Sequence, residues 1–253
     1  MKMNDFIFFS GCSYTAGVGI ELEEWSQKRY SRLVCNKLGL VDINDAWPGS
    51  CNLRIMRQTV NHLLTHYNKG EIPKCVVIMW SDAARVEYFR PQEIEYKEYQ
   101  DLVQVTPQGI GMTRSYFHRD ALENYFAFLS SDTKAVIHSL SYMVNVQAIC
   151  QLIGSPLIQL QYKSNFKRKI DRVLADKLTP DNCKTTITRS LDLLEAGPSH
   201  IVGLKDDFSF AKFLKDNNIP GSTLSLGHPS EVGHAEFANW LLNYIESNNV
   251  FTI

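Results

Sequence analysis

Two residues far apart in this 253-residue chain have side chains suited to attack on an acyl group. Ser13 lies in "GCSYTAG" near the start, and His228 lies in "LGHPSEVGH" near the end. Two further stretches, "WPGSCN" and "WSDAAR", contain small residues whose backbone N–H groups could approach a ligand. A serine hydroxyl, a histidine that accepts its proton and N–H donors for an oxyanion are the components of acyl transfer. The pattern therefore indicates nucleophilic catalysis, provided that the fold brings the stretches together.

Three of these stretches follow short apolar segments that are expected to be buried strands. The expected strands are residues 5–10, 40–46, 74–80, 155–161 and 199–204. The expected helices are residues 25–38, 52–67 and 230–247, the last with Ser230 as its N-cap. Strands that alternate with helices indicate a parallel sheet covered on both faces, with its ligand site beyond the carboxyl ends of the strands. The sequence thus predicts an α/β protein with its chemical groups at one edge of the sheet.

The segment between the third and fourth expected strands, residues 82–154, is much longer than an ordinary connection. It contains the aromatic-rich stretch "RSYFHRDALENYFAFL", followed by a long helical pattern that runs to residue 152. No linker composition or internal repeat divides the chain. We therefore expect one domain over residues 1–253, with residues 82–154 as a helical insert that serves as a lid or an interaction surface.

The four stretches resemble the sequence blocks of the SGNH/GDSL hydrolase family, in the family's order and over nearly the whole chain. The resemblance gives Ser13 the role of nucleophile and His228, which directly precedes a proline, the role of general base. It assigns an oxyanion N–H to Gly49 and the position of the asparagine donor to Ser81. It also implies a three-layer α/β/α domain with a mainly parallel, flavodoxin-like sheet, and hydrolysis of a small ester, such as a carbohydrate O-acetyl group, without metal or organic cofactor.

Two positions depart from the family pattern. The acid that usually lies two or three residues before the catalytic histidine is replaced by Leu226 and Ser225, and Ser81 replaces the asparagine of the third block. We expect a Ser13–His228 dyad, with the alternative that another acid reaches His228. The candidate acids are Asp82, Asp206, Asp207 and Glu231. The same departures motivate a second hypothesis, a binding or structural protein on this scaffold; a nucleotide-binding domain is a weaker third.

Several candidate residues also have a purely structural interpretation. Ser13 and Asn52 could each cap the helix that follows, and Asn52 could equally donate to the oxyanion. His234 could pack inside the last helix rather than act as the base. Asp82 could anchor its loop or contact substrate, and Arg85 could be a solvated charge or bind an anionic group of the substrate, the solvated charge being favoured.

The six cysteines lack the clustered spacing of a zinc site and are expected to be free thiols. Cys12 and Cys51 lie in the first and second blocks, so a cysteine nucleophile is conceivable. The side chains of adjacent residues diverge, however, and Ser13 holds the family position. The glycines of "GCSYTAGVG" match neither phosphate-binding motif, because the lysine of one and the spacing of the other are missing.

Charge and hydropathy exclude several classes of partner. The formal net charge is −1, which gives no broad attraction to nucleic acid or to an anionic membrane. No uninterrupted apolar run approaches the roughly 18–20 residues that span a bilayer, and the short apolar segment near the start is a poor secretory signal. We expect a cytoplasmic protein whose partner is a small-molecule or carbohydrate ester.

Overall fold

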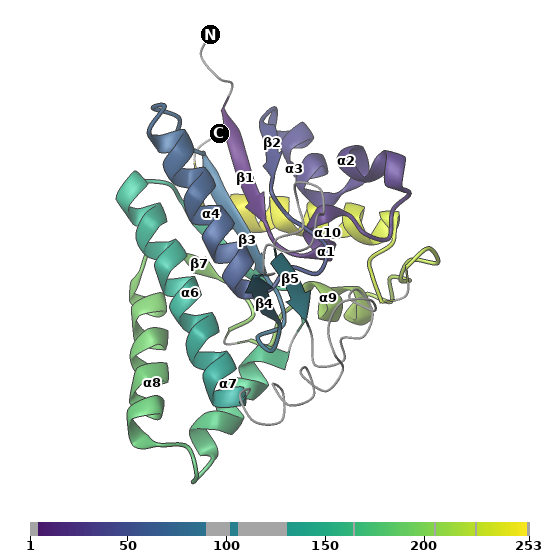
Figure 1. The fold of residues 1–253 in the computed structure, drawn as a ribbon. Helices are drawn as coiled ribbons and strands as arrows, with labels where there is room; N and C mark the ends of the chain where they lie inside the picture. The colour runs from purple at the N-terminus through teal and green to yellow at the C-terminus, as the bar shows by residue number, and fades with distance from the viewer. Residues whose placement is uncertain are drawn as a thin grey trace.

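The computed structural model describes residues 5–89, 102–105, 131–163, 165–204, 206–225 and 227–251. A five-stranded sheet lies at the centre of the molecule (Figure 1), and its strands are all parallel, in the order β2-β1-β3-β6-β7. The strands are β1 (Phe6–Ser10), β2 (Val41–Asn44), β3 (Cys75–Trp80), β6 (Leu157–Gln161) and β7 (His200–Ile201). Each lies within a segment expected to be a strand, and the flavodoxin-like α/β/α sheet is confirmed.

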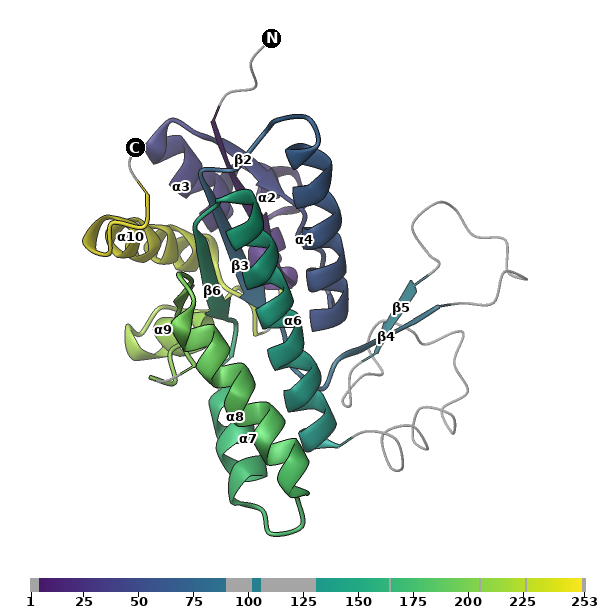
Figure 2. The same cartoon turned by 90° about the vertical axis from the view of Figure 1, so that its left-hand side faces the viewer.

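Helices cover both faces of this sheet, and Figure 2 shows the two layers with the sheet between them. One layer contains α2 (Trp25–Lys28), α3 (Tyr30–Leu38), α9 (Phe210–Asp216) and α10 (Glu231–Ser247). The other contains α4 (Asn52–Tyr67), α6 (Asp132–Ile153), α7 (Asn165–Ala175) and α8 (Asp181–Ala196). Two short elements, α1 (Ser13–Ala16) and a 3-10 turn (Leu22–Glu24), complete the connection after β1.

Alternate side chains of each central strand belong to two separate apolar cores. Ile7 and Phe9 of β1 pack beneath α3 and α10, whereas Phe6 and Phe8 pack beneath α4 and α6. Because both faces are covered, the strand is apolar without interruption, as is typical of a parallel sheet. This arrangement explains why β1 is so easily recognised in the sequence.

The segment expected to be one helix, residues 25–38, is two helices. Arg29 interrupts it with an extended backbone (ψ 148°), and its guanidinium binds the buried carboxylate of Asp42 on β2 at 2.8 Å. A tertiary ion pair therefore overrides the local helical periodicity. The N-cap expected at the last helix is confirmed, since the Ser230 side chain accepts the N–H of Gly233.

The insert between β3 and β6 is only partly helical. Its helical pattern is confirmed as α6, but Val86–Phe89 (β4) and Leu102–Val105 (β5) form a two-stranded antiparallel pair, where the helical expectation is wrong. The aromatic-rich stretch at residues 114–129 lies outside the described residues. Of the helices described, α6 alone has the length and hydropathy to cross a membrane, and its apolar composition is explained by packing in the core against the sheet.

His234 of α10 is fully buried in the core next to α3. Its Nδ1 accepts the N–H of Tyr30 at 3.4 Å, and its ring stacks on the Tyr30 ring. Burial, followed by the nearby His228, lowers the pKa of His234 from 6.5 to about 3. The packing interpretation of His234 is therefore the one that fits its surroundings.

The buried neutral His234 should make the protein acid-sensitive. Below about pH 6.5 the unfolded chain binds a proton at this residue that the folded chain does not bind, so stability falls as the pH falls. From pH 7 to pH 5 this group should lower the free energy of unfolding by about 2 kcal/mol. Urea unfolding of the wild type and of His234→Gln at both pH values measures the effect. An equal pH-dependent loss in the variant would contradict the assignment.

Candidate active site

The carboxyl ends of the parallel strands bring Ser13 and His228 together although 215 positions separate them. Ser13 is the first residue of α1, directly beyond β1, and His228 lies in the loop before α10. The Ser13 Oγ is 2.9 Å from the His228 Nε2, and the serine is 6% exposed. This is the distance at which a histidine can take the proton of a serine hydroxyl. Their chemical roles remain predictions.

Three contacts hold the loop of His228 against the turn after β1. The Tyr14 hydroxyl donates to the Gly227 carbonyl at 2.5 Å, and the Ser222 hydroxyl donates to the Gly19 carbonyl at 2.5 Å. Gly19 has a φ of 109°, and a Cβ at this residue would lie 2.1 Å from the Pro229 carbonyl oxygen. Only glycine allows this approach, so Gly19 is needed for packing against the histidine loop rather than for binding phosphate.

The second ring nitrogen of His228 has a hydroxyl beside it. Ser225 Oγ lies 3.0 Å from Nδ1. When Nε2 accepts from Ser13, the neutral ring carries its proton on Nδ1, which then donates to Ser225. Ser225 thus occupies the place at which a triad carboxylate would act.

The four acids considered from the sequence have other surroundings. Asp206 accepts the N–H groups of Gly203 and Phe208, and Glu231 pairs with Lys28 at 2.9 Å. Asp207 lines a depression beside α9. Asp82 is engaged with the α7 side of the molecule, as set out below.

The second block forms a tight turn beside the nucleophile loop. The Ser50 N–H donates to the Trp47 carbonyl at 3.1 Å, and Gly49 has a φ of 83°, as a turn with proline second and glycine third requires. The Trp47 N–H in turn donates to the Gly11 carbonyl at 3.2 Å. The N–H of Ser50 closes the turn, so the turn's hydrogen bond does not use the N–H of Gly49.

Asn52 links the second block to the end of β3. Its Oδ1 accepts the Ser81 N–H at 2.7 Å, and its Nδ2 donates to Ser139 of α6 at 3.0 Å. The helix-cap interpretation of Asn52 is wrong, because the N-cap of α4 is Cys51, whose sulfur accepts the Arg54 N–H. Ser13 likewise caps no helix, since the N-cap of α1 is the residue before it.

The hydroxyl groups of Ser139 and Ser81, both near Asn52, differ in their hydrogen bonding among the described residues. Ser139 was not predicted, and no local signal marks it, because its partner lies 87 positions away. Ser81 is 3% exposed, and its Oγ has no hydrogen-bond partner among the residues that the structure describes. A buried hydroxyl that lacks a partner is costly, and it is commonly retained where a ligand completes it.

Asp82 and Arg85 follow β3 and have different surroundings. Asp82 accepts from the Ala84 N–H, the Asn165 amide and Lys169, which joins its loop to α7. Burial raises the pKa of this carboxyl, but the Ala84 N–H and the Lys169 charge outweigh it and hold the pKa below its ordinary value. This is the surrounding of a loop anchor. Arg85 is half-buried, and its Nε is shielded from solvent, so the guanidinium is only partly solvated.

The cysteine alternative fits the structure less well than the serine. Cys12 and Cys51 are both fully buried, and Cys12 belongs to the apolar core on the α10 side of the sheet. All six cysteines are free thiols, as expected.

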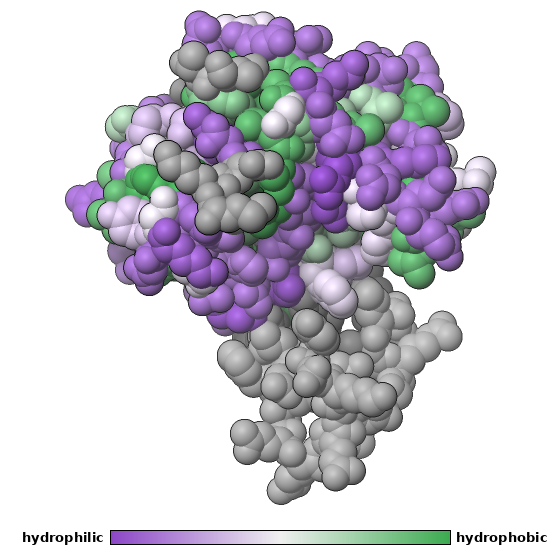
Figure 3. Space-filling model, turned by 90° about the horizontal axis from the view of Figure 1, so that it is seen from above, coloured by the Kyte–Doolittle hydropathy of each residue, from purple (hydrophilic) through white to green (hydrophobic). Residues whose placement is uncertain are grey.

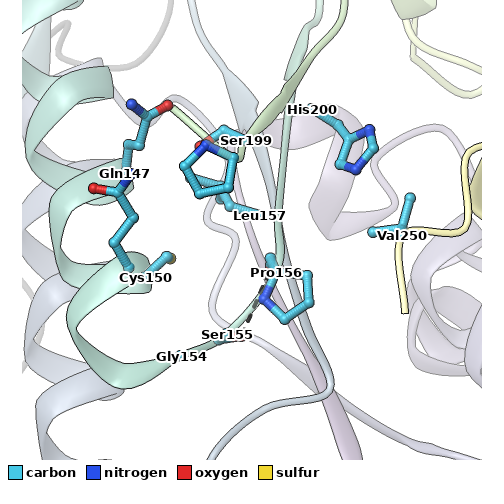
Figure 4. A pocket seen from close by; sticks show the side chains of 11 residues that line it. Gln147, Cys150, Gly154, Ser155, Pro156, Leu157, Ser199, His200 and Val250 are labelled. Atoms are coloured by element: carbon cyan, nitrogen blue, oxygen red, sulfur yellow. Dashed lines mark hydrogen bonds between the residues drawn. The ribbon is translucent and has the colours of Figure 1, made fainter. Parts of the chain in front are cut away.

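A separate cavity of about 350 Å³ lies at the opposite end of the strands. It is lined by Gln147 and Cys150 of α6, by Leu157 at the start of β6 and by His200 at the start of β7 (Figure 4). Seen from that end, the surface is mainly hydrophilic with scattered hydrophobic patches (Figure 3). This cavity is therefore distinct from the Ser13–His228 site.

Comparisons with known proteins identify the fold. No family model and no curated relative matches the chain. A crystal structure of TesA matches with a TM-score of 0.52 at 9% identity, covering 96% of this chain and 99% of that chain. The psychrotrophic esterase EstA from Pseudoalteromonas sp. matches with a TM-score of 0.50 at 11% identity (96% and 98% covered). A lipolytic protein of the G-D-S-L family from Desulfitobacterium hafniense DCB-2 matches with a TM-score of 0.51 at 8% identity (95% and 99% covered).

These three structures share a three-layer α/β/α architecture with this chain over almost its whole length. The chain thus has the SGNH/GDSL fold, a fold of ester hydrolases. Identities of this size establish the fold alone, so the chemistry must be argued from the site.

Removal of the Tyr14 hydroxyl should loosen the His228 loop. Tyr14→Phe should lower the rate of Ser13 labelling by a fluorophosphonate about tenfold, because small displacements of a reacting pair are costly. The control is Tyr30→Phe, which removes another buried tyrosine hydrogen bond, to Thr15, away from the histidine loop. Both variants should lose about 1–2 kcal/mol of stability. Equal labelling rates in the two variants would argue against a positioning role for Tyr14.

Proposed function

We propose that this protein is a serine ester hydrolase in which Ser13 forms the acyl-enzyme and His228 is the general base. The observation that carries the proposal is the 2.9 Å contact between Ser13 Oγ and His228 Nε2 at the carboxyl edge of the sheet. Ligand sites of open α/β sheets lie at this edge. The SGNH/GDSL fold adds support, since the similar structures include an esterase and a lipolytic protein.

The reaction proceeds in two halves. Ser13 Oγ attacks the ester carbonyl carbon while its proton passes to Nε2 of His228. The protonated ring then gives this proton to the leaving alcohol oxygen as the C–O bond breaks, which leaves the acyl group on Ser13. In the second half, water loses a proton to His228 and attacks the acyl carbonyl, and the proton returns to Ser13 Oγ as the acid departs.

Donors beside Ser13 stabilise the negative oxygen of each tetrahedral intermediate. We assign this role to the backbone N–H groups of Ser13 and Gly49, with Ser81 Oγ as a third donor. The buried Ser81 hydroxyl, which has no partner among the described residues, supports this assignment. Asn52 also remains a candidate, because its amide carries a second hydrogen besides the one donated to Ser139.

Ser225 takes the position of the acid of a triad in this mechanism. Its hydroxyl accepts from Nδ1 of His228 and fixes the ring orientation, but it supplies no full negative charge for the imidazolium. Hydrolysis should therefore be slower than in an enzyme with a carboxylate at this nitrogen. The substrate is inferred to be a small ester, such as a carbohydrate O-acetyl group.

Replacement of Ser13 tests the proposal most directly. Ser13→Ala should abolish hydrolysis of 4-nitrophenyl acetate and labelling by a fluorophosphonate, with the melting temperature nearly unchanged, because the alanine removes one hydroxyl at the surface of the site. Wild-type protein that is never labelled would instead favour a binding or structural protein on this scaffold. Undiminished hydrolysis by the variant would exclude Ser13 as the nucleophile.

A carboxylate at position 225 should accelerate the reaction. Ser225→Asp places a full negative charge at the ring nitrogen that Ser225 now contacts. A triad carboxylate contributes about 10⁴ in kcat, so even imperfect alignment should raise kcat about tenfold. The control is Ser225→Asn, which has similar size and no charge. A folded aspartate variant that is no faster than the asparagine variant would contradict the assigned role of this position.

A further inference from the structure

Arg85 contacts both Ser50, in the second block "WPGSCN", and the ring of Tyr162. Its Nη1 donates to the Ser50 carbonyl at 3.3 Å, and its guanidinium carbon is 5.4 Å from the centre of the Tyr162 ring. Tyr162 meets Tyr14 edge to face at 5.2 Å, and Tyr14 directly follows Ser13. The guanidinium is thus held at the edge of the site by groups that themselves border Ser13.

The positive charge of Arg85 is incompletely matched. A guanidinium has five N–H donors, and the hydrogen bond described for this one goes to the Ser50 carbonyl. Among the side chains that the structure describes, none is a hydrogen-bond partner of its solvent-shielded Nε, and no carboxylate pairs with the group. The acid three positions before it, Asp82, is already engaged with Lys169 and Asn165. A half-buried cation in this state favours an anionic ligand.

The electrostatic effect of Arg85 reaches the nucleophile loop. Burial raises the pKa of Tyr14 to about 12, and the positive charge of Arg85 acts in the opposite direction. Burial also raises the pKa of Tyr162, and the positive charge of Arg85 offsets part of this increase. Arg85 therefore acts on Tyr14, the residue next to Ser13, and favours negative charge in this part of the site.

A second cation extends this positive region away from Ser13. Lys163 Nζ lies 5.3 Å from the centre of the Tyr162 ring, so two cations contact one aromatic side chain. Lys163 also lines a depression of about 430 Å³ between the start of α7 and the length of α9. Cationic residues outnumber the carboxylates around it: Lys163, Arg168, Lys212 and Lys215 against Asp207 and Asp216.

We propose that Arg85 is a specificity-determining residue that binds an anionic group of the substrate, so that the enzyme selects esters carrying a carboxylate or another oxyanion near the scissile bond. Lys163 and the depression beside it lie where a longer anionic substrate would continue. The proposal rests on the proposed function, and it names the substrate class of that site.

Matched substrate pairs test this selection. One pair is mono-4-nitrophenyl succinate and 4-nitrophenyl butyrate, which differ by a negative charge on the acyl side. The other is 4-acetoxybenzoate and 4-acetoxybenzamide, which differ by a charge on the alcohol side. In the wild type, kcat/KM should be about ten- to hundredfold higher for the charged member of one pair. Arg85→Gln, which keeps a donor for the Ser50 carbonyl, should abolish this preference and change kcat/KM for the neutral member less than threefold.

The control variant is Arg189→Gln, which removes an equal charge from an exposed position on α8 and should retain the full preference. Lys163→Gln should reduce the preference by a smaller factor, because Lys163 is exposed. Equal loss on charged and neutral substrates in Arg85→Gln would overturn the proposal in favour of a purely structural arginine. Absence of a charge preference in both pairs would overturn it as well.

A binding measurement separates this proposal from the proposed function. Ser13→Ala should bind mono-4-nitrophenyl succinate more tightly than 4-nitrophenyl butyrate, and the double variant with Arg85→Gln should not discriminate between them. If the wild type hydrolyses neither ester but this binding preference is present, the proposed esterase mechanism is wrong. The proposal that Arg85 binds an anionic group is then still supported. If the neutral esters are hydrolysed and no binding preference is found, the proposed esterase activity is supported and the role of Arg85 is overturned.

Discussion

The contact between the turn after β1 and the loop before α10 is the constraint on which the site depends. Ser13 and His228 meet there, but their side chains alone do not fix the two segments. The Tyr14–Gly227 and Ser222–Gly19 hydrogen bonds and the close approach of Gly19 to Pro229 do so. Because each of these groups is needed for the fit, the geometry of the Ser13–His228 contact is set by the packing around it.

The sheet places this contact at an edge where other polar groups also gather. Every central strand is parallel, so the ends of β1, β3 and β6 deliver Ser13, Ser81 and Tyr162 to one side of the molecule. Both faces of the sheet are buried, and the loops at this edge form the usual ligand site of an open parallel sheet. The cavity at the starts of β6 and β7 lies at the other end and shares none of these residues.

Charge is distributed unevenly around the site. Asp82 is neutralised by Lys169 and by two further donors, which turns a loop carboxylate into an anchor. His234 is kept neutral by burial next to His228. Arg85, by contrast, is held by a carbonyl and an aromatic ring rather than by an acid among the described residues. The excess of positive charge thus falls beside Ser13.

The positions of the strands and the small-residue blocks that follow them could be predicted from the sequence, because burial on both faces makes β1 and β3 continuously apolar. The sequence also predicted, through local motifs, that Ser13 and His228 belong to one site, and the two side chains do meet there. It did not indicate that Asn52 would hold the Ser81 N–H and Ser139, since these residues are brought together by the packing of α4 and α6 against β3. The interruption of the helix at Arg29 and the strands β4 and β5 were not predicted either. Contacts with residues outside the local segment override its periodicity.

For Arg85 the sequence left a solvated charge and an anion-binding group as alternatives. Only the tertiary structure decided that Arg85 is half-buried with its guanidinium beside Ser50 and Tyr162, since these neighbours lie in loops that follow other strands. The sequence by itself determined which chemical groups the chain has and at which strand ends they emerge. The tertiary structure decided which of them touch, because distances between loops depend on how whole helices pack on the sheet.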